Sequence, residues 1–239
     1  MHVNKAVMEI EWNKSYENKD NFLFYPDDEV IRFMSKYIRK RIGLNNFKDI
    51  NLSLSHLTND NRVLDLGCGI GRHIMYCDEM GLDSFGIDLS GEAIEFAHAW
   101  AKEKKLLKIE ERIKQGDVRY LPWDNEFFSY IISHGVLDSM SFEISKLACI
   151  EAARVIKPNG FFYCDLISGD DSQHAREFNG EEIIKTDHEK GTLQSYFNLE
   201  KIHLMIKGVF DLVECNLIKR KNVLLGVYSS RYHLVLKKM

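Results

Sequence analysis

A short apolar segment followed by alternating glycines is the part of this sequence best suited to chemistry. Residues 63–71 read Val-Leu-Asp-Leu-Gly-Cys-Gly-Ile-Gly, so one acid, Asp65, precedes three glycines. The apolar run is too short for a helix and is typical of a buried parallel strand. Glycine lets a ligand approach the backbone, and the unpaired N–H groups of a following helix attract it. The segment therefore predicts a ligand-binding turn, with a helix that starts near Arg72.

A second carboxylate follows the next predicted strand. Residues 84–87, Ser-Phe-Gly-Ile, lead into Asp88. This acid lies about 20 residues past the glycines at a strand end, where a carboxylate can accept both hydroxyls of a ribose. An acid that caps the next helix is the competing interpretation, but Ser90 is better placed for that cap. Asp88 is therefore a candidate contact for an adenosine.

Two classes of ligand suit such a turn. The dinucleotide fingerprint G-x-G-x-x-G would place its third glycine at position 72, which is Arg72 here. Asp65 also disfavours a diphosphate, because like charges repel in a desolvated cleft. S-adenosylmethionine carries an ammonium group and a sulfonium, which suit an acidic strand end. These features favour adenosylmethionine, and an NAD-dependent oxidoreductase is the weaker alternative.

Four features together resemble the class I S-adenosylmethionine-dependent methyltransferases of the small-molecule type. They are Asp65, the spacing Gly67-x-Gly69-x-Gly71, the strand ending in Asp88, and the segment Gln115-Gly116-Asp117. The resemblance covers residues 60–168 well and the rest loosely. It implies an α/β, Rossmann-like fold with a seven-stranded, mostly parallel sheet, helices on both faces and an antiparallel C-terminal hairpin strand. It also implies a methyltransferase that uses S-adenosyl-L-methionine.

The resemblance also implies which residues contact the cofactor. Asp117 is expected to accept the exocyclic amine of adenine, although an ordinary turn aspartate is the competing interpretation. His134, after the fourth strand, is expected to line the sulfonium and the methyl group, with a core or capping histidine as the alternative. The cofactor residues implied are Asp65, Gly67, Cys68, Gly69, Gly71, Asp88, Leu89, Asp117, Val118 and His134.

The acceptor and any general base are less constrained. In-line displacement gains much of its rate from holding acceptor, methyl and sulfur collinear, so a base is optional. For a hydroxyl acceptor, His134 or His174 is the candidate base. The chain lacks the motifs of enzymes that methylate nucleic-acid bases, which favours a small polar acceptor. The candidate substrate residues are Tyr16, Tyr25, Asp138, Arg176 and Tyr196.

The chain is expected to form one domain over residues 1–239. Residues 1–43 are aromatic and partly helical, and we expect them to form an arm over the cleft, with Trp12, Tyr16 or Tyr25 lining the pocket. Packing of these rings on the core is the alternative. Residues 168–198 are expected to form an insert on the acceptor side, containing a hairpin around residues 188–191; a solvent-facing loop is the alternative. The basic cluster at residues 39–41 is expected at a helix C-terminus, where cations complement the helix dipole.

Asp165 interrupts a buried strand and must be either paired or functional. On the helix expected from residue 142 to 156, Glu151 needs a partner, and Arg154 is the nearest in sequence. The other expected helices cover residues 26–43, 71–80, 91–105 and 199–207. The other expected strands cover residues 112–115, 128–133, 161–167, 210–220 and 228–236.

Composition limits the remaining possibilities. The chain of 239 residues is 45% hydrophobic and has a formal charge of −4. Its net charge therefore does not attract a polyanion, which disfavours a nucleic-acid partner. No apolar run of membrane length and no signal-peptide pattern occurs, so we expect a cytoplasmic protein without a membrane partner. Five cysteines without C-x-x-C spacing predict buried thiols and no metal. We expect a monomer or homodimer; a non-catalytic sensor or scaffold that binds adenosylmethionine is the alternative function.

Overall fold

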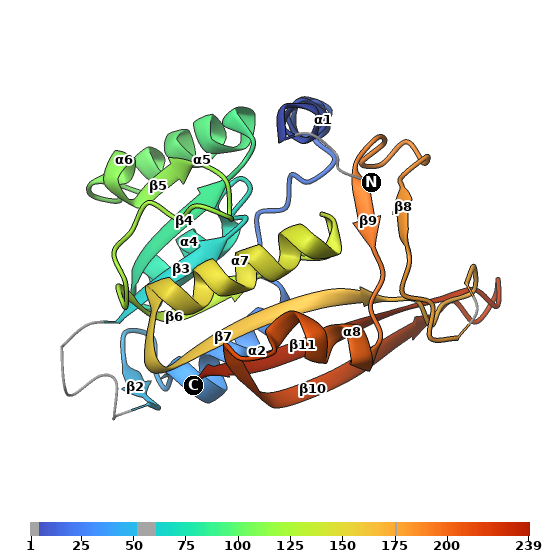
Figure 1. The fold of residues 1–239 in the computed structure, drawn as a ribbon. Coiled ribbons are helices and arrows are strands. Elements are labelled where there is room, and N and C mark those ends of the chain that lie inside the picture. Colours follow the sequence, from blue (N-terminus) through green and yellow to red (C-terminus); the bar gives the residue numbers. More distant parts are fainter. Residues whose placement is uncertain (1–4, 52–60, 175) are drawn as a thin grey trace.

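The computed structural model describes residues 5–51, 61–174 and 176–239. Its centre is a seven-stranded sheet in the order β10-β11-β7-β6-β3-β4-β5 (Figure 1). Five neighbouring strands are parallel: β3 (Arg62–Leu66), β4 (Asp83–Asp88), β5 (Ile113–Gln115), β6 (Phe128–Ser133) and β7 (Ile156–Ser168). At one edge, β11 (Tyr228–Lys238) runs antiparallel to both β7 and β10 (Phe210–Lys221). The predicted Rossmann-like α/β fold with an antiparallel C-terminal strand is confirmed.

Helices cover both faces of the sheet because the central strands are apolar on both. In β6, Ile131 packs toward one face, whereas Tyr130 and Ile132 pack toward the other. The first face is covered by α7 (Phe142–Val155) and α8 (Leu199–Ile206). The second is covered by α2 (Asp28–Phe33), the π-helical turn η1 (Met34–Ile38), α4 (Arg72–Glu79) and α5 (Gly91–Glu103), which follows β4.

The basic cluster at residues 39–41 is not at a helix C-terminus, so that prediction is wrong. The helical segment ends at Ile38, and the cluster forms strand β1 (Arg39–Arg41), paired antiparallel with β2 (Phe47–Asp49). Across this pair, Arg39 Nε donates to Asp49 Oδ1 at 2.6 Å. The side chain therefore stabilises a strand pair that the helical spacing of the preceding residues did not indicate.

One helix and one hairpin lie near the carboxyl ends of the parallel strands. Helix α1 (Lys5–Glu17) and a small hairpin, β8 (Glu181–Ile183) with β9 (Leu193–Ser195), lie side by side at this end (Figure 1). A short helix, α6 (Ile109–Arg112), precedes β5. The hairpin predicted around residues 188–191 is therefore present, with shorter strands than expected.

Four of the five cysteines are buried and Cys215 is half-buried, and all five are free thiols. In the three described ranges, no helix combines the length and apolarity needed to cross a membrane.

Candidate active site

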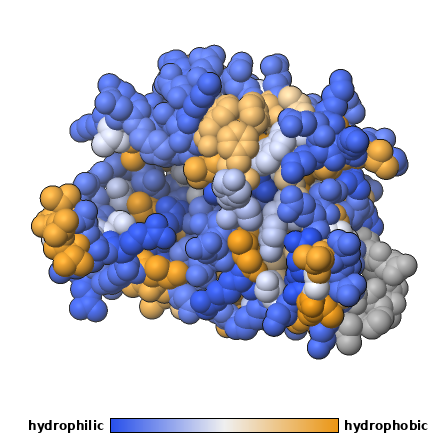
Figure 2. Space-filling view, turned by 180° about the vertical axis from the view of Figure 1, so that it is seen from behind, coloured by the Kyte–Doolittle hydropathy of each residue, from blue (hydrophilic) through white to orange (hydrophobic). Residues whose placement is uncertain are grey.

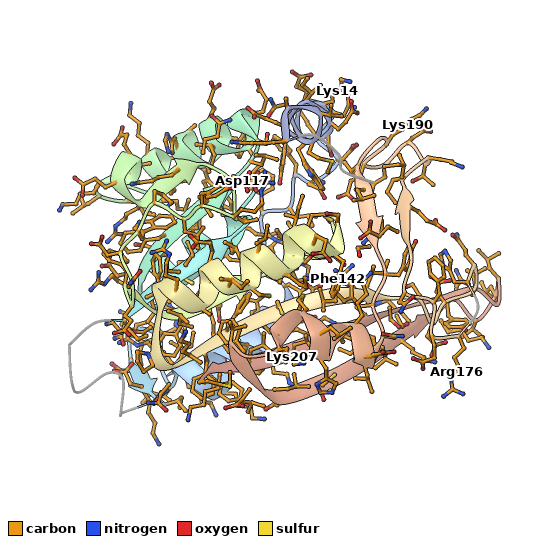
Figure 3. All side chains as sticks on the ribbon, viewed as in Figure 1. Lys14, Asp117, Phe142, Arg176, Lys190 and Lys207 are labelled. Atoms are coloured by element: carbon orange, nitrogen blue, oxygen red, sulfur yellow. The ribbon has the colours of Figure 1, made fainter. Side chains whose placement is uncertain are left out.

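A cavity of about 260 Å³ lies where the parallel strands end. Because the carboxyl ends of parallel strands meet at one edge, the segments after β3, β4 and β5 come together, and ligands bind at this edge in open α/β sheets. Figure 3 shows Asp117 between α5 and α7 at this end. The predicted cofactor residues in the wall are Gly67, Cys68, Gly69, Asp88, Leu89, Asp117, Val118 and His134.

The glycine turn after β3 forms an open cradle. Gly67 and Gly69 have φ values of +77° and +52°, which side chains disfavour. A Cβ on Gly67 would lie 2.6 Å from Val136 Cγ1, and one on Gly69 would lie 2.6 Å from the Tyr16 hydroxyl. Glycine at both positions therefore leaves the backbone open to a ligand.

Asp88 holds the turn and also lines the cavity. Its Oδ2 accepts the Gly69 N–H at 2.8 Å and its Oδ1 accepts the Ser90 N–H at 2.9 Å. Ser90 Oγ in turn accepts the Ala93 N–H, which confirms Ser90 as the cap of α5. Burial raises the pKa of Asp88 to about 6, although these N–H groups act in the opposite direction. Each carboxylate oxygen keeps a further lone pair for ligand hydroxyls.

Asp65 and Gly71 lie behind the wall of the cavity. Asp65 is 2% exposed, and neither carboxylate oxygen has a hydrogen-bond partner among the described residues. The nearest cationic candidate is His73 Nδ1, 3.6 Å away, and burial lowers the pKa of that imidazole. Gly71, with φ of +91°, precedes α4. Asp65 and Gly71 are therefore not among the residues that line the cavity.

Asp117 is already paired with Arg119. The guanidinium donates to Oδ1 from Nε at 3.0 Å and to Oδ2 from Nη2 at 2.6 Å. Burial alone would raise the pKa of Asp117, but this pair outweighs it and lowers the pKa. Any ligand donor that binds this carboxylate has to share it with Arg119.

His134 is engaged at both ring nitrogens. Arg72 is always protonated, so its Nη2 donates to His134 Nδ1 at 3.1 Å, and the Nε2–H points at Asp27 Oδ2, also at 3.1 Å. Burial lowers the pKa of His134, but the Asp165 and Asp27 carboxylates more than offset it, so the pKa is raised. Burial alone would raise the pKa of Asp27, but His134, the Glu29 N–H and the Arg72 charge together lower it.

Asp165 was expected to be either paired or functional, and the structure shows that it is paired. Its Oδ1 accepts the Gly135 N–H at 2.6 Å and its Oδ2 accepts Arg231 Nε at 2.7 Å. Arg231 also donates to Asp138 Oδ2 at 2.6 Å. Arg231 lowers the pKa of Asp165 against the effect of burial, whereas burial raises the pKa of Asp138. The buried network fixes the loop after β6, which includes His134.

Of the five candidate substrate residues, the structure brings only Tyr16 into the wall of the cavity. Tyr25 is 84% exposed, and the Arg176 side chain is 85% exposed and points away from the protein (Figure 3). Asp138 is buried against Arg231, and Tyr196 is buried against the insert. Two of these four side chains are therefore exposed to solvent, and the other two are buried in contacts within the protein.

His174 also lies outside the wall of the cavity. Its Nδ1 is 3.0 Å from Asp171 Oδ1, its Nε2 is 3.1 Å from Glu182 Oε1, and its ring stacks on Phe178. Burial lowers the pKa of this histidine, but the two carboxylates reverse the shift and raise it. The side chain ties the segment after β7 to β8.

Two segments from opposite ends of the chain close the cavity, and sequence reasoning missed part of both. From α1, Met8 joins Trp12 and Tyr16 in the wall; the latter two were expected there and Met8 was not. Their spacing of four residues places all three on one helical face. From the β8–β9 hairpin comes Glu189, whose Oε1 accepts Asn21 Nδ2 at 2.8 Å. The labelled Lys14 and Lys190 mark where α1 and the hairpin meet (Figure 3). We call α1, residues 18–21 and this hairpin the lid.

A further pair outside the wall also behaves as predicted. Glu151 accepts both Arg154 Nε and Nη2 at 2.9 Å, and it accepts the Leu121 N–H at 2.9 Å. Arg154 also donates to the Leu121 and Trp123 carbonyls. The pair holds the loop that follows Asp117.

Comparison with known proteins agrees with this geometry. Residues 64–164 match the family described as a methyltransferase domain. An uncharacterised methyltransferase of Bacillus subtilis, YcgJ, is 31% identical over 103 residues, which are 43% of this chain and 39% of that protein. The chain spans about half, or less, of the length of the curated relatives it matches.

Solved structures share the fold. A methyltransferase from Methanosarcina mazei has a TM-score of 0.62 at 17% identity, covering 80% of this chain and 98% of that one. The 1,6-didemethyltoxoflavin-N1-methyltransferase of Burkholderia thailandensis, solved with that compound and S-adenosylhomocysteine, has a TM-score of 0.61 at 17% identity, covering 98% and 88%. Residues 64–164 therefore form a methyltransferase domain, and the chain shares the fold of these solved S-adenosylmethionine-dependent methyltransferases.

Proposed function

We propose that this protein binds S-adenosylmethionine in the cavity and transfers its methyl group to a small polar acceptor by in-line displacement. The observation that carries the proposal is the convergence of the glycine cradle, Asp88 and Asp117 on one cavity. An open backbone, a carboxylate with spare lone pairs and a second carboxylate at the next strand end suit an amino acid, a ribose and an adenine in turn.

The residues present fit this cofactor. A Cβ at Gly69 would project toward Tyr16, so the turn is shaped for close approach from the cavity side. Asp88 would accept the ribose hydroxyls, and Leu89 and Val118 would offer apolar contact to the adenine. When bound, adenosylmethionine supplies an electrophilic methyl group on a sulfonium.

The protein's own contribution is positioning and exclusion of water. The lid covers the cavity, and holding two reactants in line in a dry site is worth about 7–11 kcal/mol of the barrier. Because Arg72 and Asp27 occupy both ring nitrogens of His134, that imidazole can take a proton only if one contact breaks. We therefore propose that His134 shapes the wall near the methyl group and that catalysis does not depend on it as a base.

Calorimetry and a transfer assay together test this function. S-adenosylhomocysteine should bind tightly and NAD should not, whereas the reverse result would favour an oxidoreductase. Radiolabelled adenosylmethionine should then label an acceptor from a panel of small polar metabolites. Binding without transfer to any acceptor in cell extracts would favour the non-catalytic sensor.

Affinity for S-adenosylhomocysteine should fall as the pH drops through about 6. The ionised form of Asp88 accepts hydroxyls, and with a folded-state pKa of about 6 only about one molecule in ten is ionised at pH 5. We expect a Kd about ten-fold higher at pH 5 than at pH 7, measured by calorimetry.

Protonation of Asp88 does not by itself favour unfolding at low pH. The folded pKa of Asp88 lies above the ordinary value of an aspartate, so this group favours the folded state at low pH and loses that contribution as the pH rises through about 6. Circular dichroism at each pH provides the control. A Kd that stays constant from pH 7 to 5 would remove Asp88 from ligand binding.

Replacing Asn21 with alanine should speed release of S-adenosylhomocysteine. The change removes the Asn21–Glu189 hydrogen bond across the lid. A hydrogen bond to a charged group is worth at most about 1.5–3 kcal/mol, and this one is partly solvated, so we expect release to be about 3- to 10-fold faster in stopped-flow experiments. Asn18→Ala, at an exposed position, is the matched control. Equal release rates would show that the lid does not open at this junction.

A further inference from the structure

The end of the β10–β11 hairpin is apolar and projects from the protein. Val223, Leu224 and Leu225 are 85%, 96% and 73% exposed, and Val227 is 50% exposed. In the space-filling view from behind, a hydrophobic cluster forms the left edge of the molecule, where this hairpin ends (Figure 2). Isolated apolar side chains are common on surfaces, but a contiguous apolar projection marks an interaction site.

The turn that carries these side chains is ordered. Asn222 Oδ1 accepts the N–H groups of Leu224 and Leu225, both at 3.0 Å, and Asn222 N–H donates to the Val227 carbonyl at 2.8 Å. The apolar side chains are therefore presented outward by a closed turn, so little conformational entropy remains to be lost on binding.

The residues that directly precede this turn are basic. Of the six lysines and arginines in residues 215–239, three lie next to the turn, whereas Arg231 is buried against Asp138 and Asp165, and Lys237 and Lys238 lie at the other end of the hairpin. Lys219, Arg220 and Lys221 directly precede the turn and are exposed. Lys219 pairs with Asp170 on the facing loop, and Arg220 and Lys221 extend into solvent. A basic segment, residues 219–221, therefore lies next to the apolar turn.

We propose that this hairpin end docks on an anionic lipid bilayer. Val223, Leu224 and Leu225 enter the boundary between headgroups and acyl chains, and Arg220 and Lys221 contact lipid phosphates. Apolar insertion and attraction to anionic lipids reinforce one another in peripheral membrane binding. Each contribution is small, and their combination gives reversible attachment.

A second copy of the chain is the less suitable occupant. A turn of five residues, 223–227, buries far less than the roughly 1,200–2,000 Å² of a stable interface. Two copies joined through this turn would also bring their basic segments, residues 219–221, close together, and these like charges would repel each other. An anionic surface matches both the charge and the shape of the projection.

The proposed docking site lies at the cavity end of the sheet. Ser230 in β11 pairs with Ser168 at the carboxyl end of β7, so the turn extends beyond the edge where the cavity lies. Docking would hold that edge of the protein toward the bilayer. The proposal goes beyond methyl transfer and does not depend on the acceptor.

Vesicle co-sedimentation of the full chain tests the proposal. The protein should bind vesicles of equal parts phosphatidylcholine and phosphatidylglycerol, release from them as salt is raised, and bind pure phosphatidylcholine weakly. The double variant L224S/L225S should bind at least about ten-fold more weakly, because it removes apolar contact with the acyl region. The variant R220Q/K221Q should bind anionic vesicles more weakly by a similar factor at low salt, because it removes two positive charges. Leu204→Ser, 51% exposed on α8, is the control.

Three results would overturn the proposal. These are no binding of the unmodified protein to anionic vesicles, unchanged binding by L224S/L225S, or a dimer in sedimentation velocity that L224S/L225S dissociates. Thermal melting and S-adenosylhomocysteine affinity, measured on every variant, should match those of the unmodified protein. These controls separate loss of docking from unfolding and from failure of the proposed cofactor site.

Discussion

Replacing Asp88 with alanine should weaken S-adenosylhomocysteine binding by at least about 100-fold. Without the carboxylate, the complex would lose the two hydrogen bonds proposed between Asp88 and the ribose hydroxyls. Each hydrogen bond to a charged group is worth about 1.5–3 kcal/mol. The N–H groups of Gly69 and Ser90 would also lose their acceptor, so the glycine cradle would lose its fixed shape. Calorimetry at pH 7.5 measures the effect, with thermal melting to confirm that the variant is folded.

Two further variants define what Asp88 contributes. Asp88→Asn keeps the size and one carbonyl acceptor but replaces the other with a donor, so its affinity should lie between those of the unmodified protein and the alanine variant. Glu95→Ala removes an exposed carboxylate from the next helix and should bind normally. If Asp88→Ala bound S-adenosylhomocysteine as tightly as Glu95→Ala does, the proposed adenosine site would be incorrect.

Replacing Arg231 with methionine should destabilise the protein by about 3–5 kcal/mol. The change leaves Asp138 buried without a counter-cation, and it leaves Asp165 with a histidine, His134 Nε2 at 3.6 Å, in place of an always-charged partner. For a chain of this size the loss corresponds to a fall in Tm of roughly 6–20 °C. Methionine keeps most of the aliphatic length, so the loss reports on charge rather than on packing.

The matched control is Arg176→Met, whose side chain is 85% exposed. Its melting temperature should be unchanged. Without Arg231, burial raises the folded pKa of both Asp138 and Asp165 above the unfolded value. The destabilisation should therefore be largest at neutral pH and shrink as the pH falls and the carboxyls gain protons. If the two variants melted at the same temperature at pH 7.5, the buried network would not contribute to stability.

Much of the cofactor side could be predicted from the sequence because its signals are local. A short apolar run, alternating glycines and an acid at the next strand end specify a strand, a turn and the start of a helix within about 30 residues. Parallel strands bring their carboxyl ends to one edge, so Asp88 and Asp117 had to lie near the cradle. The Ser90 cap and the Glu151–Arg154 pair follow from the same kind of local spacing.

The closure of the cavity depended on contacts between distant parts of the chain. Glu189 reaches Asn21 across 168 positions, and nothing in either local pattern indicates that contact. Tyr25, Arg176 and His174 have the right chemistry for a substrate site, but their surroundings turn them toward solvent or toward partners within the insert.

The sequence by itself therefore determined the family fold and the strand-end residues of the cavity, because hydrophobic period and turn chemistry act over a few residues. Only the tertiary structure decided which polar side chains face the cavity. Residues 39–41 show the same limit, since they form a strand by pairing with residues 47–49, and the local sequence pattern did not indicate that pairing. Burial and ion pairing depend on non-local packing, and side chains with the same chemistry become ligand contacts, structural partners or exposed groups according to that packing.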